Sequence, residues 1–253
     1  MAEQVFLSLA ISRREGLSLD ETMRLMAQAF IEWSINPRGG HRAPGKACLA
    51  GCRALSQGLA WFEAGGETAG GCGSVMRSYP FGLYFADDLV RAEQWAVAHS
   101  KLTHRDPIAL AACAAMAVGV AACVQNHEID RVVDKMCMSA HSYSVATAEM
   151  MREAYQDARS GIVPRITLDR LRGWAAHEAI AAAIYIIARH PRDLVTALLE
   201  AINTPGDSDS LGTLVGALLG AKLGSRALPN TWVQGLERHE ELLAMTREGL
   251  LDR

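Results

Sequence analysis

The amino-acid sequence predicts an all-α protein, a single compact domain of many helices over residues 1–253. Apolar residues recur at helical spacing along most of the chain. Strand signals are nearly absent, because no Asn-Gly or Asp-Gly turn joins two alternating runs and the segment VPRITL (163–168) is short and contains a proline. No linker-like change of composition and no internal repeat divides the sequence, so we expect one domain.

Helix signals begin near the N-terminus. Ser18 and Glu21 form a capping box, and the apolar positions that follow share one helix face until Pro37 ends the run. Pro44 suits the first position of a helix, and cysteines and leucines follow it at helical spacing. Further helical runs are expected at Ile129–Ser160, Leu168–Arg189, Asp193–Ile202, Leu211–Leu223 and Thr231–Leu250.

The most apolar segment, residues 108–124, follows Pro107 and carries no charged side chain. Its length is close to the minimum for a membrane span, but alanine dominates it and no aromatic residue flanks it. A helix that is apolar on all sides also fits the centre of a large helical domain. We expect a buried helix here and no membrane as partner.

Composition places the chain among ordinary globular proteins, since 50% of its residues are hydrophobic and 21% are charged. A net charge of −3 gives no electrostatic reason to expect nucleic acid as partner. The cysteines form no C-x-x-C pair, which favours reduced, buried thiols in a cytoplasmic protein. The N-terminal residues lack the basic, apolar and cleavage regions of a secretory signal.

Two loops depart from the helical pattern. Residues 65–80 (GGETAGGCGSVMRSYP) are rich in glycine and too long for a simple connection between helices. Residues 203–210 (NTPGDSDS) precede another helical run. Glycine-rich loops bring backbone N–H groups close to a ligand, often a phosphate, because no side chain intervenes. The first loop is therefore a candidate binding loop.

Asp207 and Asp209 lie two residues apart in the second loop, so their carboxylates can converge on one point. Ser210 adds a neutral oxygen. Oxygen donors of this kind suit Mg²⁺ or Mn²⁺ better than zinc. The alternative is that Asp207, Ser208 or Asp209 caps the helix that follows, and spacing alone favours that alternative.

The helix after this loop carries Gly212, Gly216, Gly220 and Gly224 at every fourth position. A glycine in a helix interior is about 1 kcal/mol less favourable than alanine. Such a series should therefore have a packing reason, and we expect the close approach of another helix.

Other polar residues allow two interpretations each. His104, in SKLTHRDP, either contacts a ligand or caps the turn before the apolar helix, and the second is the simpler interpretation. Arg77 meets either a phosphate or a buried carboxylate. Glu178 either faces a site or lies at a solvated edge, and we expect the neighbouring His177 to face outward.

Four sequence blocks, in this order, resemble those of the ADP-ribosylglycohydrolase family. GCGSVMRSYPFGL (71–83) is similar to the family's Gly-x-Gly-[Ser/Ala/Gly]-x-Met-Arg-x-x-Pro loop, and SKLTHRDP (100–107) resembles its Thr-His block. GWAAHEAIAAAIY (173–185) resembles its Gly-Trp block. GDSDSLGTLVGALLGAKLGSRALPNTW (206–232) is similar to its Gly-Asp-x-Asp-[Thr/Ser] metal block and is the most specific of the four.

The resemblance implies a helical fold with two divalent metals, usually Mg²⁺ or Mn²⁺, in a cleft where ADP-ribose is hydrolysed from an acceptor. Asp207 and Asp209 would then be the catalytic and metal-binding carboxylates, with Ser210 as a further metal ligand. A metal polarises a water and a carboxylate takes its proton. ADP-ribose or an ADP-ribosylated protein is the implied partner. The residues implied in substrate binding are Gly71, Cys72, Gly73, Ser74, Met76 and His104.

Two N-terminal blocks of the family have no match in the sequence: a Gly-Asp-Ala-Leu-Gly helix leading to a catalytic glutamate, and a Thr-Asp-Asp-Thr block with further metal ligands. The resemblance begins just past them, so the expected fold is N-terminally shortened. DET (20–22) fits a capping box and ADD (86–88) a helix start, so neither replaces the absent blocks. Two alternatives to hydrolysis follow, a protein that binds ADP-ribose or a related nucleotide without turning it over and a structural relative.

Overall fold

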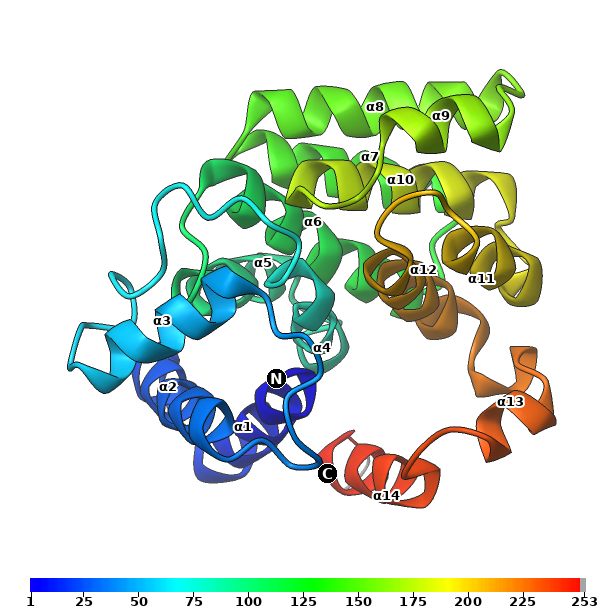
Figure 1. Ribbon diagram of the computed structural model, residues 1–253. Helices are drawn as coiled ribbons and strands as arrows, with labels where there is room; N and C mark the ends of the chain where they lie inside the picture. Colours follow the sequence, from blue (N-terminus) through cyan, green and yellow to red (C-terminus); the bar gives the residue numbers. More distant parts are fainter. Residues whose placement is uncertain (251–253) are drawn as a thin grey trace.

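The computed structural model describes residues 1–250, which form helices connected by loops (Figure 1). Within these residues no strand forms, and two isolated backbone bridges pair Gly66 with His104 and Gly71 with Ala175. The predicted all-α fold is therefore confirmed.

The N-terminal part of the chain forms α1 (Ala2–Glu15), α2 (Leu19–Ile35), α3 (Lys46–Ser56), α4 (Tyr79–Tyr84) and α5 (Leu89–Lys101). The central part forms α6 (Pro107–Val124), α7 (Ile129–His141), α8 (Val145–Arg159), α9 (Pro164–Arg170) and α10 (Ala176–Arg189). The C-terminal part forms α11 (Leu194–Ile202), α12 (Ser208–Leu223), α13 (Asn230–Gln234) and α14 (His239–Leu250). Short 3-10 helices form at Val75–Arg77 and Ser225–Ala227.

Helix α6 lies at the centre and packs against α4, α5, α7, α10 and α12 (Figure 1). Gly82 lets α4 approach α6 closely, since a Cβ added at Gly82 would lie 2.7 Å from the Cβ of Val120. Helix α6 is long and apolar enough to cross a membrane, yet 78% of it is buried inside the protein. The prediction of a buried helix in this segment is confirmed.

Three predicted helical runs are wrong in extent, because each is divided into two helices. The run 129–160 breaks where Ser144 accepts a hydrogen bond from the backbone N–H of Thr147 and so caps α8. The run 168–189 breaks near Gly173, whose φ of 79° is left-handed and ends helical geometry. The final run is divided between α13 and α14.

Two of the four glycines in the series at residues 212, 216, 220 and 224 face α11. A Cβ at Gly212 would lie 3.0 Å from Ile202 Cγ2, and one at Gly216 would lie 3.4 Å from Leu198 Cδ2. The expected close approach of another helix is therefore confirmed for these two. The third and fourth glycines of the series have nothing within 4 Å.

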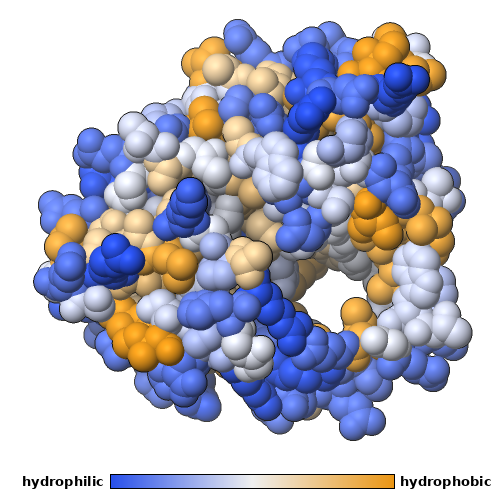
Figure 2. Space-filling model, viewed as in Figure 1, coloured by the Kyte–Doolittle hydropathy of each residue, from blue (hydrophilic) through white to orange (hydrophobic). Residues whose placement is uncertain are grey.

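The C-terminal segment reaches back to the N-terminal helices through ion pairs. The pairs are Arg42 with Glu237 at 2.6 Å, Arg238 with Glu3 at 2.9 Å and Arg38 with Glu241 at 3.1 Å. A surface ion pair is worth up to about 1 kcal/mol, so these ion pairs are individually weak and salt-sensitive. Figure 2 shows an opening between this segment and the body of the molecule.

Candidate functional site

The sequence blocks singled out above meet at one cavity of about 670 Å³. Its walls come from the N-terminus, the segment before α3, the glycine-rich loop, the loop before α10 and the start of α12, which can be followed in Figure 1. Eight residues of the predicted site line it: Gly71, Cys72, Gly73, Met76, His104, Asp207, Asp209 and Ser210. The fold therefore assembles at one place side chains from three distant parts of the chain.

Backbone contacts hold the glycine-rich loop in position. The backbone N–H of Cys72 donates to the carbonyl of Trp174 at 3.3 Å. A side chain at Gly73 would be crowded, because a Cβ would lie 3.0 Å from Cys48 Sγ and 3.3 Å from His104 Cε1. The glycine thus leaves the backbone open to the cavity, as expected of a binding loop.

Ser74 is the one predicted binding residue that does not line the cavity. Its side chain is fully buried, and its hydroxyl accepts hydrogen bonds from Ser100 Oγ at 3.0 Å and from Cys113 Sγ at 3.3 Å. The side chain therefore points into the core and away from this cavity, and the ligand contact expected of Ser74 stays a prediction.

Asp207 stands at the N-cap position of α12 but does not cap it, because no backbone N–H donates to its side chain. Its Oδ2 instead accepts from Ser210 Oγ at 2.8 Å and from Cys72 Sγ at 3.1 Å. The backbone N–H of Asp207 donates to the carbonyl of Arg172 at 2.7 Å, which fixes the loop. The capping interpretation is wrong for Asp207, whose carboxylate faces the cavity.

The two aspartates lie close enough to interact directly. Burial, and then the neighbouring Asp209 carboxyl, raise the pKa of Asp207 above its usual range. A hydrogen bond from Asp207 lowers the pKa of Asp209. The two carboxyl groups therefore influence each other's ionisation, and both line the cavity.

The donor set does not fit two divalent cations. Asp207 and Asp209 are the only acidic side chains among the residues that line the cavity. No group of three or more His, Cys, Asp or Glu side chains within residues 1–250 is arranged to hold a metal ion. Two dications need more carboxylate charge and more oxygen donors than this pair and Ser210 supply.

Arg77 does not pair with the buried carboxylate considered for it, and because it lines the cavity its contact with a phosphate stays a prediction. The side chain is 2% exposed and has no carboxylate within ion-pair distance among the described residues. Its guanidinium donates to His99 Nε2 at 2.9 Å, to the carbonyl of Gly73 at 2.8 Å and to Thr103 Oγ1 at 2.5 Å. A further bond joins Thr103 Oγ1 to His104 Nδ1 at 2.7 Å. A buried cation with neutral partners thus forms part of the cavity wall.

Both histidines of this network are held neutral. Burial, reinforced by the charge of Arg77, lowers the pKa of His104 to about 3 and places the pKa of His99 well below its usual value. His104 is 2% exposed and lines the cavity, whereas the cap of α6 is Asp106, which accepts a hydrogen bond from the backbone N–H of Ile108.

We expect acid to destabilise the fold through these histidines. The unfolded chain takes up a proton at His104 below pH about 6.5, whereas the folded protein resists it down to about 3, so stability falls as the pH drops through this window. The slope is up to about 1.4 kcal/mol per pH unit for each histidine. Urea unfolding at pH 7.5 and 5.5 measures it, and His104→Gln should flatten the dependence. An equal slope in wild type and variant would contradict the assignment.

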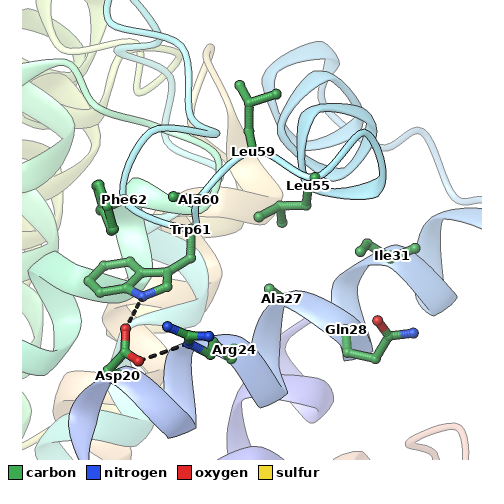
Figure 3. A pocket seen from close by; sticks show the side chains of 11 residues that line it. Asp20, Arg24, Ala27, Gln28, Ile31, Leu55, Leu59, Ala60, Trp61 and Phe62 are labelled. Atoms are coloured by element: carbon green, nitrogen blue, oxygen red, sulfur yellow. Dashed lines mark hydrogen bonds and ion pairs between the residues drawn. The ribbon is translucent and has the colours of Figure 1, made fainter.

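The remaining sequence candidates lie outside the cavity. Glu178 and His177 are half-buried. Among residues 1–250 the buried Nδ1 of His177 has no hydrogen-bond partner, so the expected outward orientation of His177 is not met. Asp20 belongs to a second pocket of about 340 Å³ (Figure 3), where it accepts from Trp61 Nε1 and from Arg24 Nε, each at 2.8 Å. With both oxygens bonded, Asp20 does not replace the absent metal block.

Some cavity residues were missed by the sequence interpretation. Arg42 and Lys46 line the rim, and two tryptophans add aromatic rings to it, the half-buried Trp33 and the exposed Trp174. The segment around Pro44 carried only a helix-start signal, so nothing in its sequence placed it beside the two loops. Trp174 lies in the block at residues 173–185 that resembles the family's Gly-Trp block, and this resemblance could have identified it as a cavity residue.

Fold and site together define an all-helical protein in which a glycine-rich cradle faces a pair of carboxylates. The sequence profile described as ADP-ribosylglycohydrolase matches residues 1–253, so the chain belongs to the ADP-ribosylglycohydrolase family. The resemblance inferred from the sequence blocks is confirmed.

Individual relatives match parts of the chain. An uncharacterised protein of Archaeoglobus fulgidus is 26% identical over 188 residues, 74% of this chain and 60% of the relative. The ADP-ribosyl-[dinitrogen reductase] glycohydrolase of Rhodospirillum rubrum is 23% identical over 69% of this chain and 53% of its own length. Mouse ADP-ribosylhydrolase ARH3 is 35% identical over 79 residues, 27% of this chain and 21% of its own. The chain thus matches 60% or less of the length of these relatives.

A solved structure supports the fold independently. A chain described as "ADP-ribosylglycohydrolase-related protein complex" superimposes with a TM-score of 0.70 and 22% sequence identity. The superposition covers 98% of this chain and 79% of the other. At this identity the likeness establishes the shared fold alone.

Proposed function

We propose that this chain binds ADP-ribose in the cavity and takes part in hydrolysing ADP-ribose from an acceptor, either a protein side chain or a small compound. The observation that carries the proposal is the meeting of the glycine-rich loop, His104 and the pair Asp207–Asp209 at one cavity. A volume of about 670 Å³ lies within the ordinary range of ligand pockets. The named glycohydrolase relatives support the same reaction class.

Each part of the cavity has a role in this proposal. The backbone at Gly71 and Gly73 offers N–H groups to a diphosphate, since no Cβ blocks the approach. Asp207, Asp209 and Ser210 would hold one divalent cation, Mg²⁺ or Mn²⁺, which when bound supplies positive charge for polarising a water or a ribose oxygen. An aspartate oxygen not engaged by the cation serves as proton acceptor.

A second candidate function is ADP-ribose binding without turnover. The small number of acidic residues in the cavity favours it, because a complete pair of metal ions has too few ligands here. In that case the chain recognises ADP-ribose or a related nucleotide as a binding module. We place either activity in the cytoplasm, because the six cysteines are free thiols and five of them are buried.

Calorimetric titration with ADP-ribose, with and without Mg²⁺ or Mn²⁺, tests the proposal. Binding that requires the cation supports a working acidic site, and release of ADP-ribose from an ADP-ribosylated protein then separates hydrolysis from binding. Binding without the cation supports the binding module. Absence of binding under both conditions would contradict both candidate functions.

A further inference from the structure

The buried network in the cavity wall fixes where the histidine protons lie. An arginine side chain offers five N–H donors and no acceptor, so every atom it contacts must accept a hydrogen bond. Arg77 Nε donates to His99 Nε2, and Arg77 Nη2 donates to Thr103 Oγ1. These two acceptors begin two separate chains of hydrogen bonds.

In the first chain, His99 Nε2 must be unprotonated in order to accept. A neutral imidazole carries one proton, so that of His99 lies on Nδ1. This nitrogen is 3.3 Å from the carbonyl oxygen of Ala96, an acceptor that matches it. The proton of His99 therefore points into helix α5 and away from the cavity.

In the second chain, the hydroxyl of Thr103 uses one lone pair for Arg77 and keeps its own hydrogen to donate. Thr103 is fully buried, and the one other atom among the described residues that bonds its Oγ1 is His104 Nδ1, at 2.7 Å. An unpaired buried hydroxyl hydrogen is costly, so it is directed at His104 Nδ1. That nitrogen accepts, and the proton of His104 lies on Nε2.

The Nε2 atom of His104 faces the glycine-rich loop. A Cβ added at Gly73 would lie 3.4 Å from it, and one at Gly71 would lie 4.0 Å from it. No protein acceptor within residues 1–250 bonds this N–H. It is thus a neutral donor aimed at the space that a ligand would fill.

We propose that Thr103 and Arg77 are positioning residues that lock His104 in its Nε2–H form, and that His104 recognises an oxygen acceptor of the bound ligand. The ligand in this inference is ADP-ribose, so in this respect the inference rests on the proposed function. The phosphate and ribose oxygens of ADP-ribose are acceptors of the required kind. A lysine at the same place would offer a charge, whereas the neutral imidazole offers one directed hydrogen bond. The arrangement selects an oxygen at a defined position, and the neutral imidazole itself adds no charge to the cavity.

Nitrogen NMR of protein labelled at histidine, without ligand, tests the proton positions. We expect His104 with Nε2 protonated and Nδ1 unprotonated, and His99 with the opposite pattern. A protonated Nδ1 on His104 overturns the proposal. Because no ligand is present, this result is independent of the ADP-ribose titration.

The second measurement is the affinity for ADP-ribose of the isosteric variant Thr103→Val. We expect binding to weaken by about fivefold, the effect of one neutral hydrogen bond, together with a changed His104 Nδ1 resonance. Thr103→Ser, which restores the hydroxyl, should recover both. The matched control is Thr147→Val, another buried threonine, remote in α8, which should change neither. Unchanged affinity and resonance in Thr103→Val, or equal losses in Thr147→Val, overturn the positioning role.

Discussion

Replacing Asp207 with asparagine is expected to abolish cation-dependent ADP-ribose binding and any turnover while leaving the fold intact. Asparagine keeps the shape of the side chain and one oxygen for the hydrogen bonds from Ser210 and Cys72. It removes the negative charge that holds a cation. Loss of an outer-shell partner alone weakens metal binding by about 10- to 100-fold, so loss of this carboxylate should weaken it by at least that much. Calorimetry with Mn²⁺, followed by ADP-ribose, measures both steps.

The same variant should gain stability when no cation is present. The pKa of Asp207 in the fold lies above its unfolded value of 3.8, so at neutral pH folding disfavours the ionised carboxylate. Asparagine carries no charge and removes this penalty. We therefore expect a thermal midpoint equal to or higher than that of the wild type. A variant that is both less stable and still responsive to cation would contradict the assignment of Asp207 as a ligand.

Asp193 provides the matched control, since it caps α11 in the ordinary way by accepting from the backbone N–H of Thr196 at 3.0 Å. Asparagine is nearly as good a cap as aspartate. Asp193→Asn should therefore change stability by a few tenths of a kcal/mol at most and leave ADP-ribose binding unchanged. The contrast between the two variants separates a carboxylate that caps the N-terminus of a helix from one that faces a cavity.

Sequence spacing could not make this distinction, because an aspartate before a helix has the same pattern in both roles. What decides it is the position of Cys72 and Ser210 around Asp207 Oδ2, and Cys72 is 135 positions away in the chain. Local patterns identified both loops as unusual. Their meeting depends on how α10 and α12 pack on α6, which local periodicity does not determine.

Arg77 is a residue whose contacts within the chain the sequence did not predict. A single arginine after a glycine-rich loop suggested an anionic partner, yet its partners are neutral groups from α5 and the loops around it. Nothing in the sequence marks these partners. The histidine tautomers follow from the hydrogen bonds, which only the distances between the atoms reveal. By contrast, the central helix followed from composition alone, because eighteen residues without charge in a globular chain have few other places to lie.

Gly206→Ala is expected to disrupt the acidic loop and the fold around it. A Cβ at this position would overlap the carbonyl oxygen of Arg172 and lie 2.6 Å from the carbonyl carbon, both of them rigid backbone atoms. Overpacking of this kind typically destabilises by about 1–3 kcal/mol. The same carbonyl accepts the hydrogen bond from the backbone N–H of Asp207, so any shift that relieves the clash moves the carboxylate.

Two measurements check this expectation, urea unfolding for the stability and calorimetry for cation-dependent ADP-ribose binding, which should be lost. Gly220→Ala is the matched control, since it makes the same change in the interior of α12 where nothing lies within 4 Å. There alanine should stabilise by up to about 1 kcal/mol and leave binding unchanged. Full binding in Gly206→Ala would mean that the position of Asp207 does not depend on its close contact with Arg172. In that case the site would rest on the contacts among Asp207, Ser210 and Cys72 alone.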